Sequence, residues 1–310
     1  MKISRFPAAA AWAMALTLAM PALGAEKGVS LRPKLTKGAT ARFTVTTEGS
    51  NTTWSDAFLQ GETTQTVNRE IRVAHKVIES SESGAVVELT YERIKLSVQV
   101  PAMNMIHAFD SQTPPSRDAD SPIAEVMRPL VGATITLTIG SDGQIKNVKS
   151  PRSLAKPGPL GALPNELLDP EFIRKTYANL YSVNCAKASA APGDTWTFAE
   201  SRPLFAGAKL NIGYSYKMAS ATGQEASITS TGKAEVAMPA PNAAGNNNGS
   251  NKPSTELKAS SFEGSVTWDS KAGMARSVTR SERLKFTMDP NQGSIISNET
   301  TLRETITRSE

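Results

Sequence analysis

The sequence predicts a mainly β protein with one strongly curved antiparallel sheet, a half-barrel, and two short helices packed on one face. Three observations lead to this prediction. Apolar and polar residues alternate over many short segments, which is the pattern of half-buried strands. Turn-forming residues separate these segments. Only two segments, 122–130 and 170–182, space their apolar residues as a helix does.

The first 25 residues have the pattern of a secretory signal peptide. Lys2 and Arg5 precede an apolar run at 7–20, and small residues follow at 22–25. The run is shorter than the roughly 20 residues that span a membrane, although an uncleaved anchor is the alternative. We therefore expect a periplasmic or secreted protein whose mature chain, 26–310, is one soluble β-rich domain without a transmembrane segment.

Strand patterns recur along the mature chain. In each one, apolar residues share one face, while Ser, Thr, Lys and Glu occupy the other. This pattern is typical of an antiparallel sheet with one side in water. The clearest segments are 41–45, 71–77, 135–139, 210–218 and 284–288.

One strand pattern changes phase. Apolar residues occupy odd positions from Val87 to Tyr91 and even positions from Ile94 to Val100. A β-bulge near Arg93 would keep both sets on the buried face and would bend the strand between Glu92 and Ile94. The alternative is a flat two-sheet sandwich, in which the phase change marks a strand crossing between sheets.

Turn and loop signals separate the strands. Gly-Ser-Asp-Gly at 140–143 and the segment 269–273 each predict a hairpin turn. The segment 151–164 is rich in Pro and Gly and is expected to be a loop. The segment 239–253 contains no large apolar side chain to bury, so we expect a mobile loop.

Both predicted helices begin with a capping residue followed by proline. Ser121-Pro122 opens the first and Asp169-Pro170 opens the second, which fits the preferences of helix N-termini. The second helix has one apolar face. The residues of this face are Phe172, Ile173, Tyr177, Leu180 and Tyr181.

Short similarities between the two parts of the mature chain suggest a duplication with halves at about 33–150 and 188–310. Chance likeness among β-meanders is the alternative. In a duplicated chain the two helices would join the halves. The matching segments are 38–43 with 193–198, 84–90 with 223–229, and 109–111 with 268–270.

Five short segments together resemble an uncharacterised family of exported bacterial proteins: Leu35 to Gly38, 91–94, 109–111, 142–143 and 192–196. The layout is more distantly similar to the periplasmic lipoprotein-carrier superfamily, in which a curved antiparallel sheet forms a half-barrel and helices cover its concave side. The resemblance implies a cavity for an apolar ligand and no catalytic residues. No Cys stands near the signal cleavage site, so the chain departs from the lipoprotein members.

Residues that could carry chemistry are few. His75 is in phase with an apolar strand face and is expected to point into the core. His107 lies close to Asp110 and Ser111, but no Gly-x-Ser-x-Gly motif accompanies it. Two His and one Cys, Cys185, give too few ligands for a typical zinc site, and Cys185 is expected to be a small buried residue.

Charge and motif content exclude further classes. The whole chain carries a net charge of +5, and loss of Lys2 and Arg5 lowers it by two. No basic run interleaved with aromatics is present, so we expect no nucleic-acid partner. No phosphate-binding or dinucleotide-binding glycine motif occurs. We therefore expect no cofactor, no metal and no catalytic residue.

The expected function is that of a non-enzymatic cell-envelope binding or carrier protein for an apolar, lipid-like ligand. The expected lid of a ligand cavity is the stripe Phe172, Tyr177, Leu180 and Tyr181, and plain core packing is the alternative for this stripe. A structural or protein-interaction domain of the envelope without a ligand is the alternative function. A hydrolase that uses His107 is a third and weaker alternative.

Overall fold

The computed structural model describes residues 28–55, 61–154, 162–184, 187–204, 208–238, 254–289 and 295–309. The predicted signal peptide at 1–25, the predicted mobile loop at 239–253 and the lone Cys185 lie outside these residues. Their predictions therefore stay predictions.

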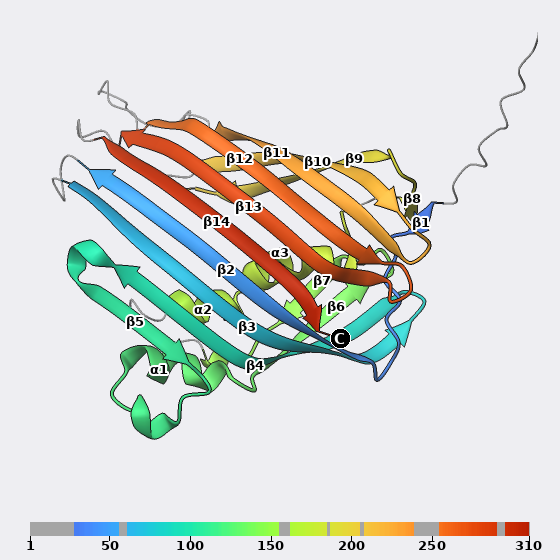
Figure 1. The fold of residues 1–310 in the computed structure, drawn as a ribbon, viewed down its shortest axis with the longest axis horizontal. Helices are drawn as coiled ribbons and strands as arrows, with labels where there is room; N and C mark the ends of the chain where they lie inside the picture. Colours follow the sequence, from blue (N-terminus) through green and yellow to red (C-terminus); the bar gives the residue numbers. More distant parts are fainter. Residues whose placement is uncertain are drawn as a thin grey trace, which may run out of the picture.

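One antiparallel sheet of 12 strands dominates the described residues (Figure 1). Its order is β7-β6-β4-β3-β2-β14-β13-β12-β11-β10-β9, and β5 pairs with β4. The predicted single antiparallel sheet is confirmed, and the two-sheet sandwich is wrong. The strands of this sheet are β2 (Thr40–Ser55), β3 (Gly61–Ser81), β4 (Gly84–Val100), β5 (Met105–Asp110), β6 (Thr134–Gly140), β7 (Ile145–Lys149), β9 (Thr195–Pro203), β10 (Lys209–Ala221), β11 (Glu225–Ala237), β12 (Ser254–Asp269), β13 (Met274–Asp289) and β14 (Ile296–Ser309).

The first and last long strands meet in the middle of this sheet. β2 pairs with β14 from Arg42 opposite Ser309 to Ser55 opposite Ile296. Strands β2 to β7, here called the N-half, therefore lie on one side of this junction, and strands β9 to β14, the C-half, lie on the other. A second, two-stranded sheet joins β1 (Val29–Ser30) to β8 (Ser189–Ala190). The proposed duplication of the halves stays a prediction.

The predicted bulge is confirmed in β4. Arg72 pairs with Arg93 and the next residue, Val73, pairs with Tyr91, so Glu92 has no cross-strand partner on β3. Tyr91 and Ile94 are both buried as a result. The extra residue thus keeps both apolar sets of this 17-residue strand on the core side.

Both predicted helices are present. α1 (Pro122–Met127) continues into a 3₁₀ turn at Arg128–Leu130, and Ser121 Oγ accepts a hydrogen bond from Ala124 N. α3 (Pro170–Tyr181) is capped by the Asp169 carboxylate, which accepts from Glu171 N. Further 3₁₀ turns lie at Pro101–Met103, Pro115–Arg117 and Arg152–Leu154.

A third helix, α2 (Ala162–Leu168), overlaps the end of the predicted loop. The prediction that the loop reaches Pro164 is therefore wrong. Pro164 lies in the first turn of α2, where a missing N–H costs no intrahelical hydrogen bond. Leu167 and Leu168 are buried, so tertiary packing stabilises a helix that the Pro- and Gly-rich sequence before it concealed.

The sheet curves around α3. Arg174 of α3 donates through Nε to the carbonyl oxygen of Ile145 on β7, at 3.3 Å, and α3 also packs against β13. Behind β2, β14 and β13 in Figure 1 lie α2 and α3. The main core fills the space between the helices and the sheet, and its largest fully buried side chains include Trp268, Tyr91, Tyr181 and Phe43.

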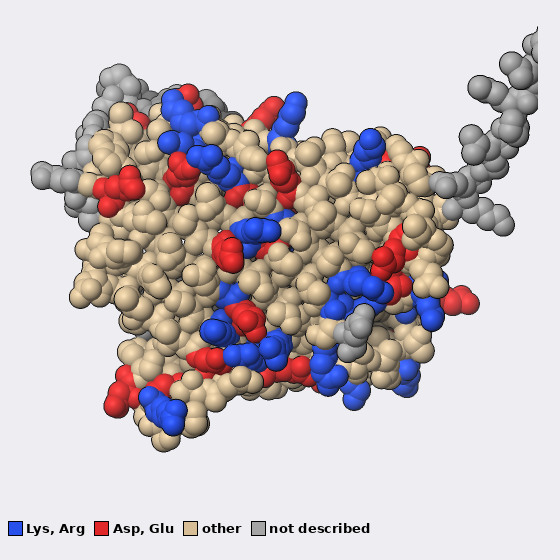
Figure 2. Space-filling view, viewed as in Figure 1, with Lys and Arg blue, Asp and Glu red and all other residues tan. Residues whose placement is uncertain are grey.

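The opposite face of the sheet carries mixed charge. In the view of Figure 2, Lys and Arg side chains lie beside Asp and Glu, and wide areas between them are uncharged. Cross-strand pairs account for part of this pattern. Arg283 and Glu299 form one such pair, with 2.6 Å between Nη2 and Oε1.

Candidate functional site

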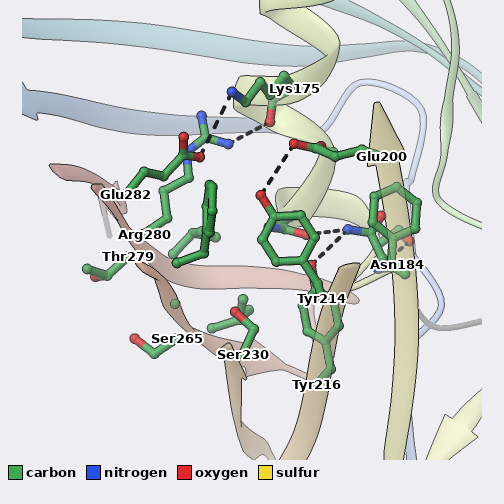
Figure 3. Close-up of a pocket in the computed structure, with 18 of the residues that line it drawn as sticks. Lys175, Asn184, Glu200, Tyr214, Tyr216, Ser230, Ser265, Thr279, Arg280 and Glu282 are labelled. Carbon is green, nitrogen blue, oxygen red and sulfur yellow. Dashed lines mark hydrogen bonds and ion pairs between the residues drawn. The ribbon is translucent and has the colours of Figure 1, made fainter. Parts of the chain in front are cut away.

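A cavity of about 300 Å³ lies between α3 and strands β9 to β13 of the C-half (Figure 3). We call it the C-half cavity. Its volume is at the lower end of the range for small-molecule sites. Aromatic and aliphatic side chains of the sheet line it together with serines and a threonine, and charged side chains gather at one end.

Strand register builds the aromatic wall of the C-half cavity. Tyr214 on β10 pairs with Phe198 on β9, and Tyr216 pairs with Trp196, so all four side chains share the concave face. The rings of Trp196 and Tyr216 stack with centroids 5.6 Å apart. Tyr214 meets Phe262 edge to face at 6.0 Å. These contacts fix the rings in orientation and leave their surfaces toward the cavity.

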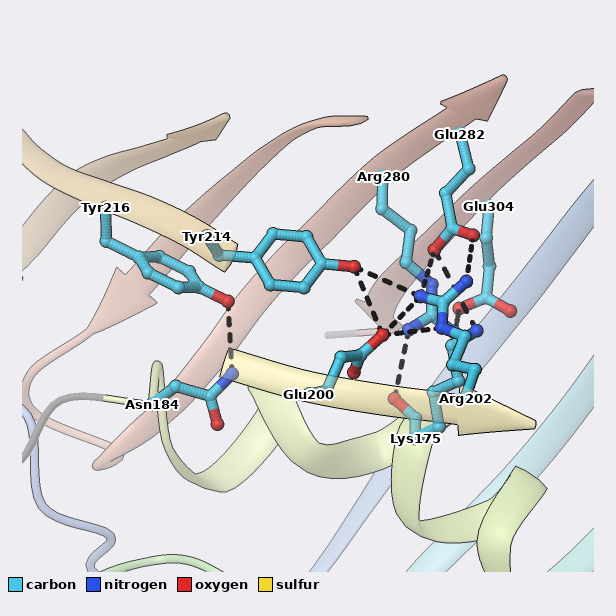
Figure 4. A network of polar contacts seen from close by, with 9 residues as sticks. All are labelled: Lys175, Asn184, Glu200, Arg202, Tyr214, Tyr216, Arg280, Glu282 and Glu304. Atoms are coloured by element: carbon cyan, nitrogen blue, oxygen red, sulfur yellow. Dashed lines mark hydrogen bonds and ion pairs between the residues drawn. The ribbon is translucent and has the colours of Figure 1, made fainter. Parts of the chain in front are cut away.

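The charged end of the C-half cavity is a network of ion pairs (Figure 4). Arg202 on β9 donates to both carboxylate oxygens of Glu282 on β13, at 2.6 Å and 2.9 Å. Arg202 also donates to the Tyr214 hydroxyl at 3.0 Å, and this hydroxyl donates to Glu200 at 3.3 Å. Two-point contacts of this kind are the strongest form of an ion pair.

Two charged residues behind this pair come from α3 and β13. Lys175 Nζ lies 3.9 Å from Glu282 Oε1. Arg280 donates through Nη1 to the carbonyl oxygen of Lys175 at 3.0 Å, and its other terminal nitrogen pairs with Glu304 on β14. The network therefore links α3 to the concave face of the sheet at β13 and β14.

Burial and neighbouring charges shift the ionisation of the network. Burial disfavours the charged form of Glu282, but the hydrogen bond from Arg202 and the charge of Lys175 lower its pKa to about 2. Burial lowers the pKa of Lys175 to about 8, and Glu282 partly offsets this effect. At neutral pH, Glu282 is therefore ionised and Lys175 is the group most easily neutralised.

Asn184 closes the other end of the C-half cavity. It adopts a left-handed backbone conformation with φ of 51°. Its side-chain amide donates to the Tyr216 hydroxyl at 3.1 Å. The cavity thus has a neutral amide–phenol contact at one end and a charged network at the other, with aromatic, aliphatic and small hydroxyl side chains between. This arrangement can hold an elongated molecule that is partly apolar.

The four side chains expected to form a lid do not line the C-half cavity. Tyr177, Leu180 and Tyr181 are almost fully buried in the main core. Phe172 is partly buried and stacks on Arg69, with 5.0 Å between the guanidinium carbon and the ring centroid. The structure brings Tyr177 and Tyr181 together around His75. A lid role for the stripe stays a prediction, and these positions match the alternative of core packing.

Sequence reasoning identified the strand 210–218 but not its functional side chains. Tyr214 and Tyr216 were visible there as alternating aromatics, which is a usable signal for a cavity wall. Arg202 and Glu282 carried no such signal, because their pairing depends on which strands face each other across the concave side.

The two histidines have different surroundings. His75 is buried, as expected, and its Nδ1 is hydrogen-bonded to the Tyr181 hydroxyl. His107 is partly exposed on β5. Asp110 accepts from Arg93 at 2.7 Å, and Ser111 accepts from Ile94 N at 3.1 Å. Asp110 and Ser111, the acidic and hydroxyl residues nearest to His107 in the sequence, therefore both have partners other than His107.

The described residues contain no candidate metal site and no helix suited to span a membrane. Within 28–309, leaving out the undescribed segments, no group of three or more His, Cys, Asp or Glu side chains is placed to hold a metal ion. Asp118 forms an ion pair with Arg128. None of the helices in the described part of the chain has the length and apolar character needed to cross a membrane.

Comparison with known proteins relates the fold to one solved structure. No protein-family model and no curated protein matches the chain. A structure of lipovitellin, described for lipid–protein interactions, matches with a TM-score of 0.51 and 9% identity, over 89% of this chain and 26% of that chain. The chain therefore spans about a quarter of the lipovitellin chain that it matches. This likeness shows the fold alone.

Two further matches are too weak to relate the folds. DynF from the dynemicin biosynthesis pathway of Micromonospora chersina has a TM-score of 0.21 and 7% identity, over 92% of this chain and 86% of that chain. An outer membrane channel from Pseudomonas putida F1 has a TM-score of 0.21 and 9% identity, over 89% and 97% of the two chains.

Proposed function

We propose that this chain is a non-enzymatic binding or carrier protein of the cell envelope that holds an apolar, lipid-like ligand in the C-half cavity. The observation that carries the proposal is the cavity itself, with its aromatic wall and the fixed ion pair of Arg202 and Glu282 at one end. Ligand sites are mostly apolar concavities with a few well-placed polar groups. The C-half cavity has an aromatic wall and a fixed polar end, and serine, threonine and further charged side chains also line it.

Two further observations support the proposal. The fold likeness to lipovitellin relates the chain to a protein described for its interactions with lipid. The signal-like N-terminus, with Lys2 and Arg5 before an apolar run, supports export to the periplasm or the medium. N-terminal sequencing of the protein from its host tests the export step, since an intact Met1 would contradict it.

The ligand test uses Ala178, which lies on α3 at the C-half cavity. Ala178→Phe places a ring in the cavity without breaking the helix. Ala199→Phe is the matched control, because Ala199 is exposed on β9 and its neighbours Phe198 and Glu200 take the cavity side. We expect native mass spectrometry to find a lipid-like ligand on the wild type and on Ala199→Phe, and the mass of this ligand to be missing from Ala178→Phe.

The same variants can be titrated with the apolar dye N-phenyl-1-naphthylamine. The expected result is a fluorescence increase with the wild type and the control, and at least a tenfold weaker response with Ala178→Phe. If no ligand is recovered and the dye binds all three proteins alike, the C-half cavity is not a ligand site and the proposal fails.

A second candidate function, a protein-interaction domain of the envelope, is favoured by exposed apolar side chains at one end of the sheet. This end, at the left of Figure 1, is where β2 ends and β14 begins. Single exposed apolar side chains are common on protein surfaces, whereas a group of them at one place marks an interaction site. Those at this end are Trp54, Met103, Ile106, Met238 and Ile295.

The two candidates are separated by one comparison. Trp54→Ser with Ile106→Ser removes exposed apolar surface and leaves the C-half cavity intact. Loss of a reproducible partner from envelope pull-downs with this variant, but not with Ala178→Phe, would favour the interaction domain. The opposite pattern, with ligand loss only in Ala178→Phe, favours the carrier.

A further inference from the structure

A second cavity, also of about 300 Å³, lies under the junction of the two halves of the sheet. We call it the junction cavity. It is bounded by β2, β3 and β14 on the sheet side and by α2 and α3 on the other. Lys175 and Arg280 line both cavities and stand between them.

The inner end of the junction cavity is one polar row across four neighbouring strands. Arg69 on β3 pairs with Thr47 on β2, Thr47 pairs with Glu304 on β14, and Glu304 pairs with Arg280 on β13. Cross-strand partners lie on the same face of a sheet, so all four side chains point to the helices. Thr176 of α3 faces this row from above.

Five buried atoms of this group have no hydrogen-bond partner among the described residues. Four of them can donate: Thr47 Oγ1, Arg69 Nε, Thr176 Oγ1 and Arg280 Nε. The fifth, Glu304 Oε1, can only accept, and it already forms an ion pair with Arg280 Nη2. Thr47, Arg69 and Thr176 are 4%, 7% and 3% exposed, so bulk water does not reach them freely. Buried polar groups are rarely left unpaired, because the loss of their hydrogen bonds to water is then uncompensated. All five belong to residues that line the junction cavity.

Four of the five unpaired atoms favour a hydrogen-bond acceptor with negative charge. Two of these four are guanidinium N–H groups, which can only donate, and two are hydroxyls, which can donate. The negative charge of Glu304 is offset by its ion pair with Arg280. The cavity is lined by three cationic side chains, Arg69, Lys175 and Arg280, and by two carboxylates, Glu166 and Glu304. Glu166 is 42% exposed and lies 3.5 Å from Arg69, so it neutralises that guanidinium only weakly.

The next rows of the sheet alternate between apolar and polar side chains toward the mouth of the junction cavity. Gly49 pairs with Val67 and Leu302, which form an apolar row together with Phe172 above them. Asn51 pairs with Gln65 and with Thr300 in the row after that. Each row lies two residues further along the strands, which is about 7 Å. The cavity is thus polar at its inner end, apolar in the middle and polar at its mouth.

We propose that the junction cavity binds a short carboxylate amphiphile, a medium-chain fatty acid. Its carboxylate accepts hydrogen bonds from the unpaired atoms of Arg69, Arg280, Thr47 and Thr176. Its alkyl chain lies along Gly49, Val67 and Leu302, beneath Phe172. Charge-assisted bonds to a carboxylate are about twice as strong as neutral ones, which explains why the anion is preferred over an alcohol. This site is separate from the C-half cavity and does not depend on the function proposed for it.

The test is calorimetric titration of the full exported chain with sodium octanoate, and with 1-octanol as the uncharged probe. Thr47→Val and Thr176→Val each keep the side-chain shape and remove one hydroxyl. We expect each to weaken octanoate binding about tenfold, the change that corresponds to one hydrogen bond. Thr46→Val is the matched control, because Thr46 is exposed on the other face of β2. It is expected to bind octanoate as the wild type does.

Gly49→Leu provides a second variant that does not depend on removing a polar group. A Cβ at Gly49 meets Leu302 Cδ1 and Thr301 O at 3.5 Å, which is ordinary contact, so the backbone tolerates the change. The added side chain fills the apolar row and is expected to abolish octanoate binding. Ala178→Phe, which blocks the C-half cavity, is expected to leave octanoate binding unchanged.

Four outcomes would overturn the proposal. The first is that millimolar octanoate gives no heat with the wild type, which means that water alone satisfies the polar row. The second is that 1-octanol binds as tightly as octanoate. The third is that Thr47→Val, Thr176→Val and Gly49→Leu all bind like Thr46→Val. Loss of octanoate binding in Ala178→Phe alone would place the ligand in the C-half cavity instead.

Discussion

Arg202 on β9 and Glu282 on β13 form a two-point ion pair, although three strands, β10 to β12, separate theirs in the sheet. Neighbouring strands of a flat sheet are about 5 Å apart, so this contact requires the C-half to curve strongly around its concave side. The pair therefore links the two ends of the C-half and determines the shape of the cavity beside it.

The first prediction concerns this ion pair. Arg202→Met is expected to lower the free energy of unfolding by about 3 kcal/mol, because it leaves the Glu282 carboxylate buried without its main partner. Arg202→Met with Glu282→Met is expected to cost less than the sum of the single changes. Urea denaturation of the four proteins gives the coupling free energy. If the two substitutions lower the free energy of unfolding strictly additively, the ion pair contributes nothing to stability.

The second prediction concerns pH and His75. Burial lowers the pKa of His75 from its ordinary 6.5 to about 3. Between these values the unfolded chain binds a proton that the folded chain does not, so stability falls as the pH falls below 6.5. We expect the free energy of unfolding to drop by about 2 kcal/mol between pH 7 and pH 5 through this one group.

Two variants isolate the contribution of His75. His75→Gln is expected to flatten the dependence of stability on pH in this range. His107→Gln is expected to keep the dependence, since His107 is partly exposed on β5. The measurement is urea denaturation at pH 7, 6 and 5. If the stability of His75→Gln depends on pH as steeply as that of the wild type, groups other than His75 cause the dependence.

The third prediction concerns the bulge in β4. Deletion of Glu92 joins Tyr91 to Arg93, whose partners Val73 and Arg72 are already consecutive on β3. The apolar alternation then becomes regular, so we expect a folded protein with a modest loss of stability from reduced curvature. Deletion of Glu88, four residues earlier, turns one apolar set to the wrong face. We expect that variant to be unfolded by circular dichroism. Equal behaviour of the two deletions would contradict this account of the bulge.

The fourth prediction compares two glycines with nearly the same backbone conformation, Gly132 at φ of 82° and Gly143 at φ of 81°. A Cβ on Gly132 meets no atom within 4 Å, whereas a Cβ on Gly143 would lie 2.1 Å from the carbonyl oxygen of Tyr181. Gly132→Ala is expected to cost about 1 kcal/mol from the left-handed conformation alone. Gly143→Ala is expected to cost clearly more, because the end of α3 has to move. Thermal denaturation distinguishes the two.

Local features of the fold were predictable from the sequence. The alternation of apolar residues predicted the buried face of β10. The phase change predicted the bulge that the structure has at Glu92. Ser121 and Asp169 identified the starts of two helices. Each of these depends on residues close together in the chain, so their physics is local. The inward position of His75 followed from the same alternation.

The sites could not be predicted in the same way. The row of Arg69, Thr47, Glu304 and Arg280 depends on the pairing of β2 with β14, which joins distant parts of the chain. No local pattern specifies that register. The lid prediction considered the apolar stripe of α3 by itself, whereas Lys175 on another side of the same helix reaches both cavities. Helix α2 was missed because its buried leucines follow a segment rich in Pro and Gly.

The pairing of β2 with β14 has a consequence for the order of folding. Thr44 and Val45 can pair with Thr307 and Ile306 only after the chain has been synthesised past residue 307. Until then the outer edge of β2 has open backbone donors and acceptors, the type of edge that pairs with other chains. Contacts between such distant residues also slow folding, because a long loop has to close before they contribute. The polar row of the junction cavity, which needs this pairing, therefore forms among the last parts of the protein.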